Sequence, residues 1–166
     1  MNSCAMFEDV SGEEQLLPLA KVDILEGLPQ SEVEYVATRS SNVRLSKRES
    51  LILGESLLSI LLLVSGRVRV HEPSSRGLDL TFSVVEGGTV VGQTGSTPRP
   101  SRVLGVEALE PSNLTVVGWG DFEDLVSRNP KVGLKTLRLL DERLDAYESQ
   151  LSDLIRKEVP ARLAGL

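Results

Sequence analysis

A glycine-rich segment followed by a lone arginine is the part of this sequence best suited to bind a ligand. The segment reads Gly87-Gly88-Thr89-Val90-Val91-Gly92-Gln93, and Arg102 follows it in Pro100-Ser101-Arg102-Val103. Backbone N–H groups exposed at glycines and a fixed guanidinium both match the oxygens of one phosphate. Two simpler interpretations stay open. The glycines could serve only tight turns that need positive φ angles, and Arg102 could pair with a nearby acid such as Glu107.

Short apolar runs surround this segment and indicate how it is held. From Val43 to Val117 the runs are rich in Val, Leu, Ile and Thr, with turn signals roughly ten residues apart. A short helix is expected around Val33 and Val36, with a break at Ser40-Ser41-Asn42. The pattern predicts a mainly β fold, a roll or jelly roll of short antiparallel strands with flanking helices.

A long helix with a narrow apolar seam is expected after the strands. It begins at Asn129-Pro130, where proline suits the first helical turn. The seam alternates spacings of three and four over about three heptads and consists of Leu137, Leu140, Leu144, Tyr147, Leu151 and Leu154. Such a narrow seam favours a second helix and hence a homodimer, because a helix that covers its own domain usually has a wider apolar face. An amphipathic helix lying on its own barrel remains the alternative.

Composition limits the classes of protein to which this chain could belong. Its 166 residues are 40% hydrophobic and 25% charged, which suits one globular domain with an added element. The net charge of −6 disfavours nucleic-acid binding by this part alone. The longest apolar run, Leu57 to Val64, is too short to span a membrane, and no signal peptide is expected. One cysteine, Cys4, forms no internal disulfide, so a cytoplasmic location is expected.

Catalytic and metal chemistry find little support in the residue types. His71 is the only histidine, so clustered metal ligands or a histidine-based triad cannot be built. We expect it in a strand at the surface of the roll. Haem held by His71 with Cys4 or the terminal amine is a remote alternative. No pair of carboxylates indicates a catalytic site, so no enzyme, catalytic residue or metal ligand is predicted. Trp119 and Phe122 are expected to anchor the long helix in the core.

The order of these motifs resembles the effector domain of the CRP/FNR superfamily of bacterial transcription regulators. The likeness runs from about Val22 to Leu166 and includes Val64-Ser65-Gly66-Arg67-Val68-Arg69-Val70, the glycine loop, Asn129-Pro130 and the long helix. The resemblance implies a cyclic-nucleotide-binding-type β-roll and a homodimer through the long helix. It also implies a winged helix-turn-helix that would begin near Val159 and would carry the DNA binding.

The resemblance also implies where an effector binds, and the sequence departs from that pattern. Gly92 and Arg102 match the glycine and the phosphate-binding arginine of members that bind cyclic nucleotides. Gln93 stands in place of a ribose-binding glutamate, and Val103 in place of a small hydroxyl residue. A neutral hydrogen bond from Gln93 is roughly half as strong as a charge-assisted one.

The base-contacting positions on the long helix hold Tyr147 and Glu148 instead of hydroxyl residues of the usual kind. Because Tyr147 also fits the seam, it is expected to pack between helices. The cofactor is therefore unknown, and a cyclic nucleotide stays one candidate among small-molecule effectors.

These inferences divide the chain into four parts: a mobile arm at 1–12, an effector roll at 13–128, a dimerisation helix at 129–157 and the start of a DNA-binding domain at 158–166. The expected function is effector sensing and dimerisation for a regulator whose DNA contacts lie in a domain beyond this chain. The alternatives are a stand-alone regulatory or interaction module of the same fold, a regulator that has lost its ligand, and a haem-based gas sensor.

Overall fold

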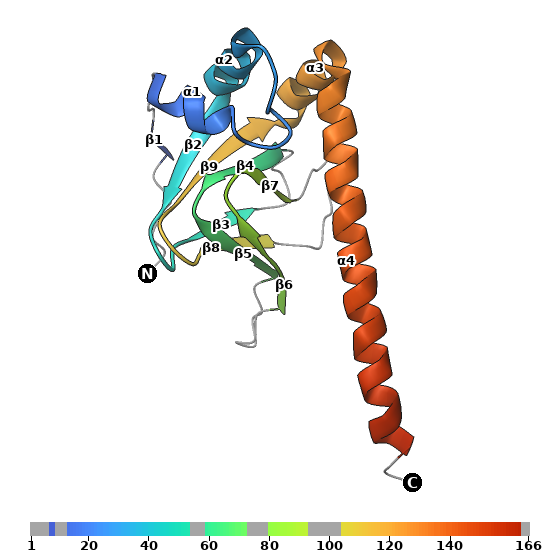
Figure 1. Ribbon diagram of the computed structural model, residues 1–166. Coiled ribbons are helices and arrows are strands. Elements are labelled where there is room, and N and C mark those ends of the chain that lie inside the picture. The colour runs from blue at the N-terminus through green and yellow to red at the C-terminus, as the bar shows by residue number, and fades with distance from the viewer. Residues whose placement is uncertain (1–6, 9–12, 54–58, 73–79, 93–103, 164–166) are drawn as a thin grey trace.

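Two antiparallel sheets face each other as a roll, with short helices at one end and one long helix alongside (Figure 1). The computed structural model describes residues 7–8, 13–53, 59–72, 80–92 and 104–163, the last ten of these as backbone only. In these ranges the strand order is β1-β2-β9-β4-β7 in one sheet and β3-β8-β5-β6 in the other. The predicted mainly β roll of short antiparallel strands is confirmed.

The strands are β1 (Phe7–Glu8), β2 (Ser40–Leu45), β3 (Ser50–Leu53), β4 (Ser59–Ser65), β5 (Arg67–Glu72), β6 (Leu80–Glu86), β7 (Thr89–Gly92), β8 (Leu104–Ala108) and β9 (Ser112–Gly118). The helices are α1 (Glu13–Leu19), α2 (Gln30–Arg39), α3 (Trp119–Arg128) and α4 (Pro130–Leu163).

Strand β4 explains the longest apolar run of the sequence, because both of its faces are buried. Ile60 and Leu62 pack with the helices, whereas Leu61 and Leu63 point into the roll. A strand that is covered on both faces has no polar alternation, so it reads as a continuous apolar run. All four side chains are at most 1% exposed. This strand therefore lies between two apolar cores, one inside the roll and a second between the roll and the helices.

The second core lies between the roll and the helices and holds the start of α4. Phe122 and Leu125 of α3 and Val132 of α4 are buried there. Trp119 packs against the same core, with its ring centroid 5.6 Å from that of Phe122. The predicted anchoring role of these two aromatic residues is confirmed. The first turns of α4 are thereby fixed to the roll.

A polar network on the outside of α2 and α3 braces the corner from which α4 leaves. The guanidinium carbons of Arg39 and Arg128 lie 4.1 and 3.6 Å from the ring centroid of Tyr35. Glu32 accepts hydrogen bonds from Arg128 and from the side chain of Asn129, the residue before α4. Cations stack well on aromatic faces, so this corner holds the direction of α4 relative to the roll.

Three boundaries differ from the expectations, two of them because of strand pairing. Phe7 and Glu8, expected in a mobile arm, form β1 beside Val43 and Asn42. Ser40, expected in a break, pairs with Val117 and begins β2. Helix α4 continues past residue 157 to Leu163, and helix-favouring Ala161 and Arg162 follow Pro160 in it.

Candidate functional site

Strand β7 carries the glycine of the predicted phosphate segment at the end of the five-stranded sheet. Gly92 pairs with Leu61 of β4 beside a bulge, and its φ is 149°. A Cβ atom on Gly92 would meet nothing within 4 Å, so its backbone conformation, not crowding, demands glycine. Gly88 has a φ of 96° and donates its N–H to Leu63 O at 2.7 Å. The turn interpretation is thus confirmed for Gly88.

An arginine on α4 reaches across to β7 just before Gly92. The Arg143 guanidinium donates through Nη2 to Val90 O and through Nη1 to Val91 O, the latter at 3.4 Å. Its side chain is half-buried, and this desolvation lowers the pKa of Arg143, while the attraction of Tyr147 and Asp23 raises it. A guanidinium stays charged in proteins. A fixed positive charge therefore lies beside Val90 and Val91, within the predicted phosphate segment.

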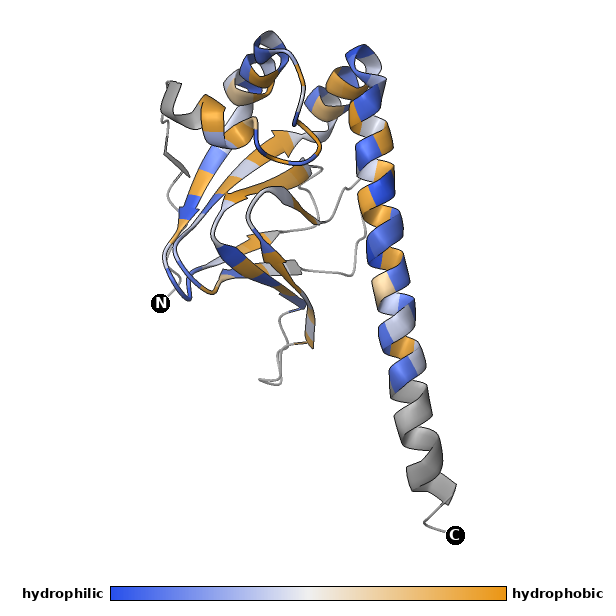
Figure 2. Ribbon diagram, in the orientation of Figure 1, coloured by the Kyte–Doolittle hydropathy of each residue, from blue (hydrophilic) through white to orange (hydrophobic). Residues whose placement is uncertain are grey.

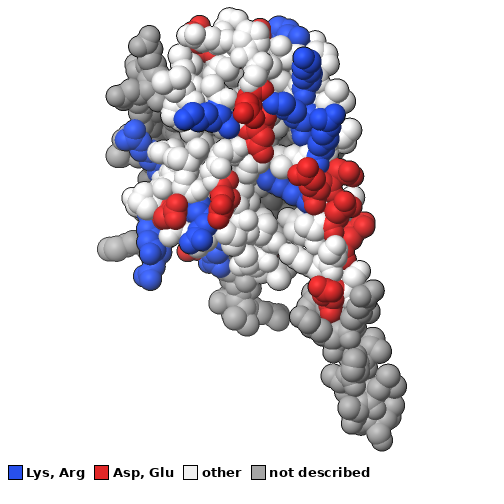
Figure 3. Space-filling view, in the orientation of Figure 1, with Lys and Arg blue, Asp and Glu red and all other residues white. Residues whose placement is uncertain are grey.

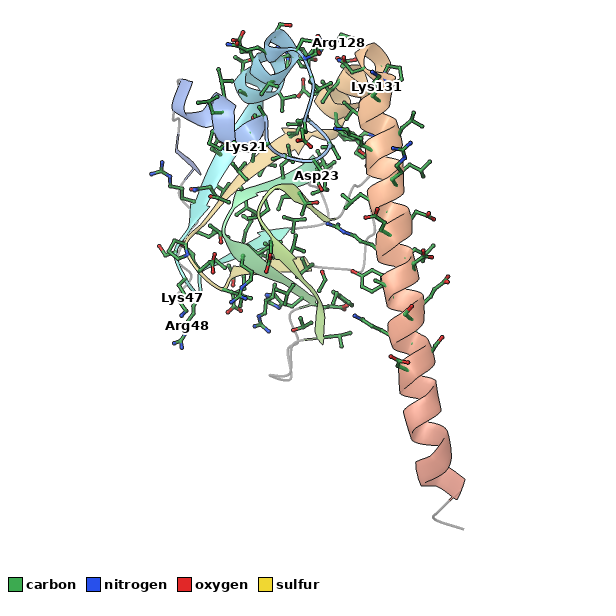
Figure 4. All side chains as sticks on the ribbon, in the orientation of Figure 1. Lys21, Asp23, Lys47, Arg48, Arg128 and Lys131 are labelled. Atoms are coloured by element: carbon green, nitrogen blue, oxygen red, sulfur yellow. The ribbon has the colours of Figure 1, made fainter. Side chains whose placement is uncertain are left out.

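The turn after α1 brings polar groups to the same interface between roll and helix. Asp23 lies in this turn, on the side toward α4 (Figure 4). Its N–H donates to Gly88 O at 2.9 Å, and Lys135 Nζ of α4 donates to the carbonyl of Asp23 at 2.8 Å. Asp23 Oδ1 and Thr89 Oγ1 are buried and accept no hydrogen bond from the described residues. These contacts tie α4, the turn and β7 together.

The structure places only part of the predicted effector site. Tyr147 lies one helical turn after Arg143 and is 39% exposed. Glu148 is exposed, and its spacing from Arg143 places it about 140° around the helix, away from β7. The predicted residues Gln93, Arg102 and Val103 lie outside the described residues. Glu107, the proposed surface partner of Arg102, accepts hydrogen bonds from Arg69 at 2.9 and 2.6 Å.

Sequence reasoning missed the residues that connect the roll to α4. No sequence pattern singles out Arg143, Asp23 or Lys135, because charged side chains of this kind usually face the solvent. The available signal was the place of Arg143 beside the seam, one turn before Tyr147. Its partners are backbone carbonyls about fifty residues away in the chain, which no side-chain motif reveals.

Removal of Arg143 is expected to loosen this interface. Arg143→Met keeps much of the apolar stem but leaves the Val90 and Val91 carbonyls without their donor. Because hydrogen bonds to charged groups contribute about 1.5–3 kcal/mol when buried and less at a half-exposed site, the free energy of unfolding should fall by about 1–2 kcal/mol. Arg138→Met on the exposed face is the control, with an expected change within about 0.5 kcal/mol. Equal urea midpoints for the two variants would contradict the bridging role.

The predicted seam on α4 is exposed along its described length. Leu137, Leu144 and Leu151 are 64%, 55% and 59% exposed, and the side chain of Leu154 lies outside the described residues. Figure 2 shows apolar residues recurring along α4 well below the part that contacts the roll. The roll is contacted instead by a different face, which carries Val132, Thr136, Leu139 and Arg143. The alternative interpretation, in which the seam covers its own barrel, is therefore wrong. The role of the seam as a dimer surface stays a prediction.

His71 lies in β5 as predicted, but its expected place at the surface is wrong. The side chain is 4% exposed and lies over Gly105, its register partner in β8. A Cβ atom on Gly105 would overlap the His71 ring, so the glycine makes the space that buries the ring.

No group of three or more metal-ligating side chains occurs among the described residues. Of the described helices, none combines the length and apolarity needed to cross a lipid bilayer.

Solved structures share this architecture at low sequence identity. The catabolite activator protein of Thermus thermophilus aligns with a TM-score of 0.63 and 22% identity, over 80% of this chain and 62% of that one. A CooA mutant from Carboxydothermus hydrogenoformans aligns with a TM-score of 0.66 and 23% identity, over 88% and 94% of the two chains.

A cAMP-binding acyltransferase from Mycobacterium smegmatis gives a TM-score of 0.65 and 24% identity, over 81% of this chain and 42% of the enzyme. The chain thus spans less than two thirds of the length of the Thermus protein and of the enzyme. No family model and no curated sequence matches it. The chain therefore shares the fold of these proteins, a cyclic-nucleotide-binding-like β-roll with a long C-terminal helix.

Proposed function

We propose that this chain senses a small-molecule effector and dimerises through α4 as part of a CRP/FNR-type, DNA-binding transcription regulator in the cytoplasm. The observation that carries the proposal is the exposed seam of α4, on a helix whose other face is tied to β7. A helix with one face fixed to the roll and an apolar stripe left exposed suits association with a second helix. DNA contacts belong to a domain beyond this chain.

The mechanism we propose is a population shift carried by the contacts between β7 and α4. An effector bound beside Gly92 would move the strand, and Arg143 would pass that movement to the helix. Arg143 lies on the face of α4 that contacts the roll, and the seam lies on another face of the same helix. A change in the orientation of the helix therefore alters how two helices meet. A ligand shifts such an equilibrium only by its difference in affinity for the two states.

The effector is expected to bind in a manner unlike the usual one for cyclic AMP. Calorimetric titration should give no sub-micromolar dissociation constant for cyclic AMP or cyclic GMP, because Gln93 and Val103 lack the charge and the hydroxyl of the usual pattern. Restoring them in Gln93→Glu/Val103→Ser should strengthen cyclic AMP binding about tenfold, as charge-assisted bonds are about 1–1.5 kcal/mol stronger than neutral ones. Sub-micromolar binding by the unaltered protein would contradict this departure.

A second candidate is a regulatory module that controls an attached enzyme. The likeness to the cAMP-binding acyltransferase favours it, because that enzyme carries the same fold within less than half of its length. The encoding gene distinguishes the two candidates. A basic helix-turn-helix after Leu166 would support the transcription regulator, whereas a catalytic domain there would support the module.

A further inference from the structure

The start of α4 carries an exposed patch that neither the roll nor the seam uses. This cationic patch consists of Lys131, Leu134 and Arg138, which stand three and four residues apart and so share one helix face. All three residues are exposed, and Leu134 is 56% exposed. At about 100° per residue, the centre of the patch lies about 130–140° around α4 both from the seam and from the face that contacts the roll. A second helix at the seam therefore leaves this patch uncovered.

The two cations of the patch have no contact within the described chain that accounts for them. The side chains of Lys131 and Arg138 form no ion pair and no hydrogen bond with the described residues. Lys135 stands four residues after Lys131, and like charges at this spacing destabilise a helix. Lys131 also lies in the first turn of α4, which holds no acidic residue, and a cation there opposes the helix dipole. Helix stability therefore does not explain the positive charge at this end of α4.

Acidic side chains near this corner are engaged by other residues. Glu32 accepts a hydrogen bond from Arg128 at 3.2 Å, and Asp121 forms an ion pair with Arg39 at 3.7 Å. Arg128 and Lys131 both lie at the corner where α3 meets α4 (Figure 4). Lys and Arg side chains gather at the upper end of α4, whereas Asp and Glu side chains gather below them (Figure 3). In a chain with a net charge of −6, this corner attracts acidic groups that the chain as a whole repels.

We propose that the cationic patch is a docking surface for an acidic, amphipathic segment of another protein. Along the helix axis Leu134 lies between Lys131 and Arg138, so an apolar contact has a cation for a carboxylate on each side. An apolar centre with a polar rim is the usual anatomy of a protein interface, and charges at the rim set the orientation of the partner. The patch is separate from the effector segment and from the seam, so this role goes beyond effector sensing and dimerisation.

The backbone under the patch is fixed before any partner binds. Val132, next to Lys131, is 0% exposed in the core between the roll and the helices. The side chain of Asn129 donates a hydrogen bond to Glu32 at 2.9 Å just before α4 begins. A surface that is already ordered loses less conformational entropy on association. The patch therefore suits binding without a rearrangement of the roll.

The composition of the patch favours a protein over a nucleic acid as the partner. Backbone contacts to a nucleic acid go to phosphate and sugar, which leave Leu134 without an apolar contact. Asp141 and Glu142 follow Arg138 by one helical turn and repel a long chain of phosphates. A short acidic segment with an apolar side chain contacts both the cations and the leucine, and it ends before these acids.

Titration of the full ¹⁵N-labelled chain with a designed peptide tests the docking surface. The probe is a synthetic helical peptide with leucine along one face and glutamate on the others. Amide shifts should be largest from residue 128 to residue 138. Lys131→Glu/Arg138→Glu should raise the dissociation constant about tenfold or more, because two attractive contacts become repulsive. Leu134→Ala, which leaves the charges in place, should raise it about fivefold through lost apolar burial.

The matched control is Lys47→Glu/Arg48→Glu, which makes the same change in net charge at the exposed turn between β2 and β3 (Figure 4). It should change the dissociation constant less than about twofold, because attraction between exposed charges is screened over about 10 Å. Circular dichroism checks that each variant is folded, and Leu134→Ala carries the test if the charge reversal disturbs folding. Absence of peptide binding, equal weakening by the control, or largest shifts at the seam would overturn the proposal. A DNA duplex that binds through the same patch at least as tightly as the peptide would also overturn it, in favour of a nucleic-acid partner.

Discussion

Leu144→Asp is expected to convert the dimer to a monomer. The leucine is 55% exposed in the single chain and lies at the middle of the seam, so its burial depends on a second copy. Each copy loses about 1.5–3 kcal/mol of apolar burial and gains a carboxylate that must be desolvated. Two altered copies together raise the dissociation constant by about a thousandfold or more. Light scattering at micromolar concentration measures the change as a halving of the mass.

Ser149→Asp provides the matched control for this prediction. Ser149 is exposed on α4 and lies about 140° around the helix from Leu144. The same charge placed there should leave the mass unchanged. An unchanged mass for Leu144→Asp, in a protein that is dimeric when unaltered, would show that association uses another surface.

Gly66→Ala is expected to cause a large loss of stability. Gly66 turns the chain between β4 and β5 with a φ of 92°, a conformation that L-residues avoid. A Cβ atom there would also lie 2.7 Å from the carbonyl oxygen of Pro111 and 2.7 Å from Ser112 Cα. Backbone strain of about 1–2 kcal/mol and overpacking of about 1–3 kcal/mol should together lower the free energy of unfolding by about 2–5 kcal/mol.

Gly120→Ala separates this effect from a general cost of replacing glycine. Gly120 is exposed in the first turn of α3, and a Cβ atom on it would meet nothing within 4 Å. Because alanine favours helix over glycine, the variant should be as stable as the unaltered protein or up to about 1 kcal/mol more stable. Thermal and urea unfolding of both variants give the comparison. Similar losses in the two would contradict the crowding at Gly66.

Local patterns predicted the strands and helices well because short-range chemistry governs them. The turn glycines and the runs rich in Val, Leu and Ile predicted the roll, and Asn129-Pro130 predicted where α4 begins. Boundaries that depend on pairing were less accessible. Ser40 is a poor strand residue by itself, yet it is in β2 because Val117 of β9 lies beside it. Strand pairing is decided by residues far apart in sequence, which no local window contains.

The candidate site was predicted less completely than the fold. The sequence pointed to the segment that contains Gly92 and to Tyr147. In the structure, β7, which carries Gly92, is joined to α4, which carries Tyr147, through Arg143. The sequence did not reveal Arg143 as the connection, because a charged residue on a helix surface has the same sequence pattern whether it contacts water or backbone carbonyls. The sequence also predicted His71 at the surface. The sequence does not show that Gly105 lies beside His71 in a neighbouring strand and leaves space for its ring.

The sequence by itself determined the kinds of surface that this chain must make. Periodicity alone required an apolar seam from Leu137 to Leu154 and short strands with glycine turns, because side-chain spacing on a helix or strand is fixed by backbone geometry. Only the tertiary structure decided which face of α4 meets the roll. Val132 and Thr136 became buried and the leucines remained exposed, since the core around Phe122 and Leu125 is assembled from distant segments. The ligand segment on β7 and the seam on α4 thereby came to be connected through one side chain, that of Arg143.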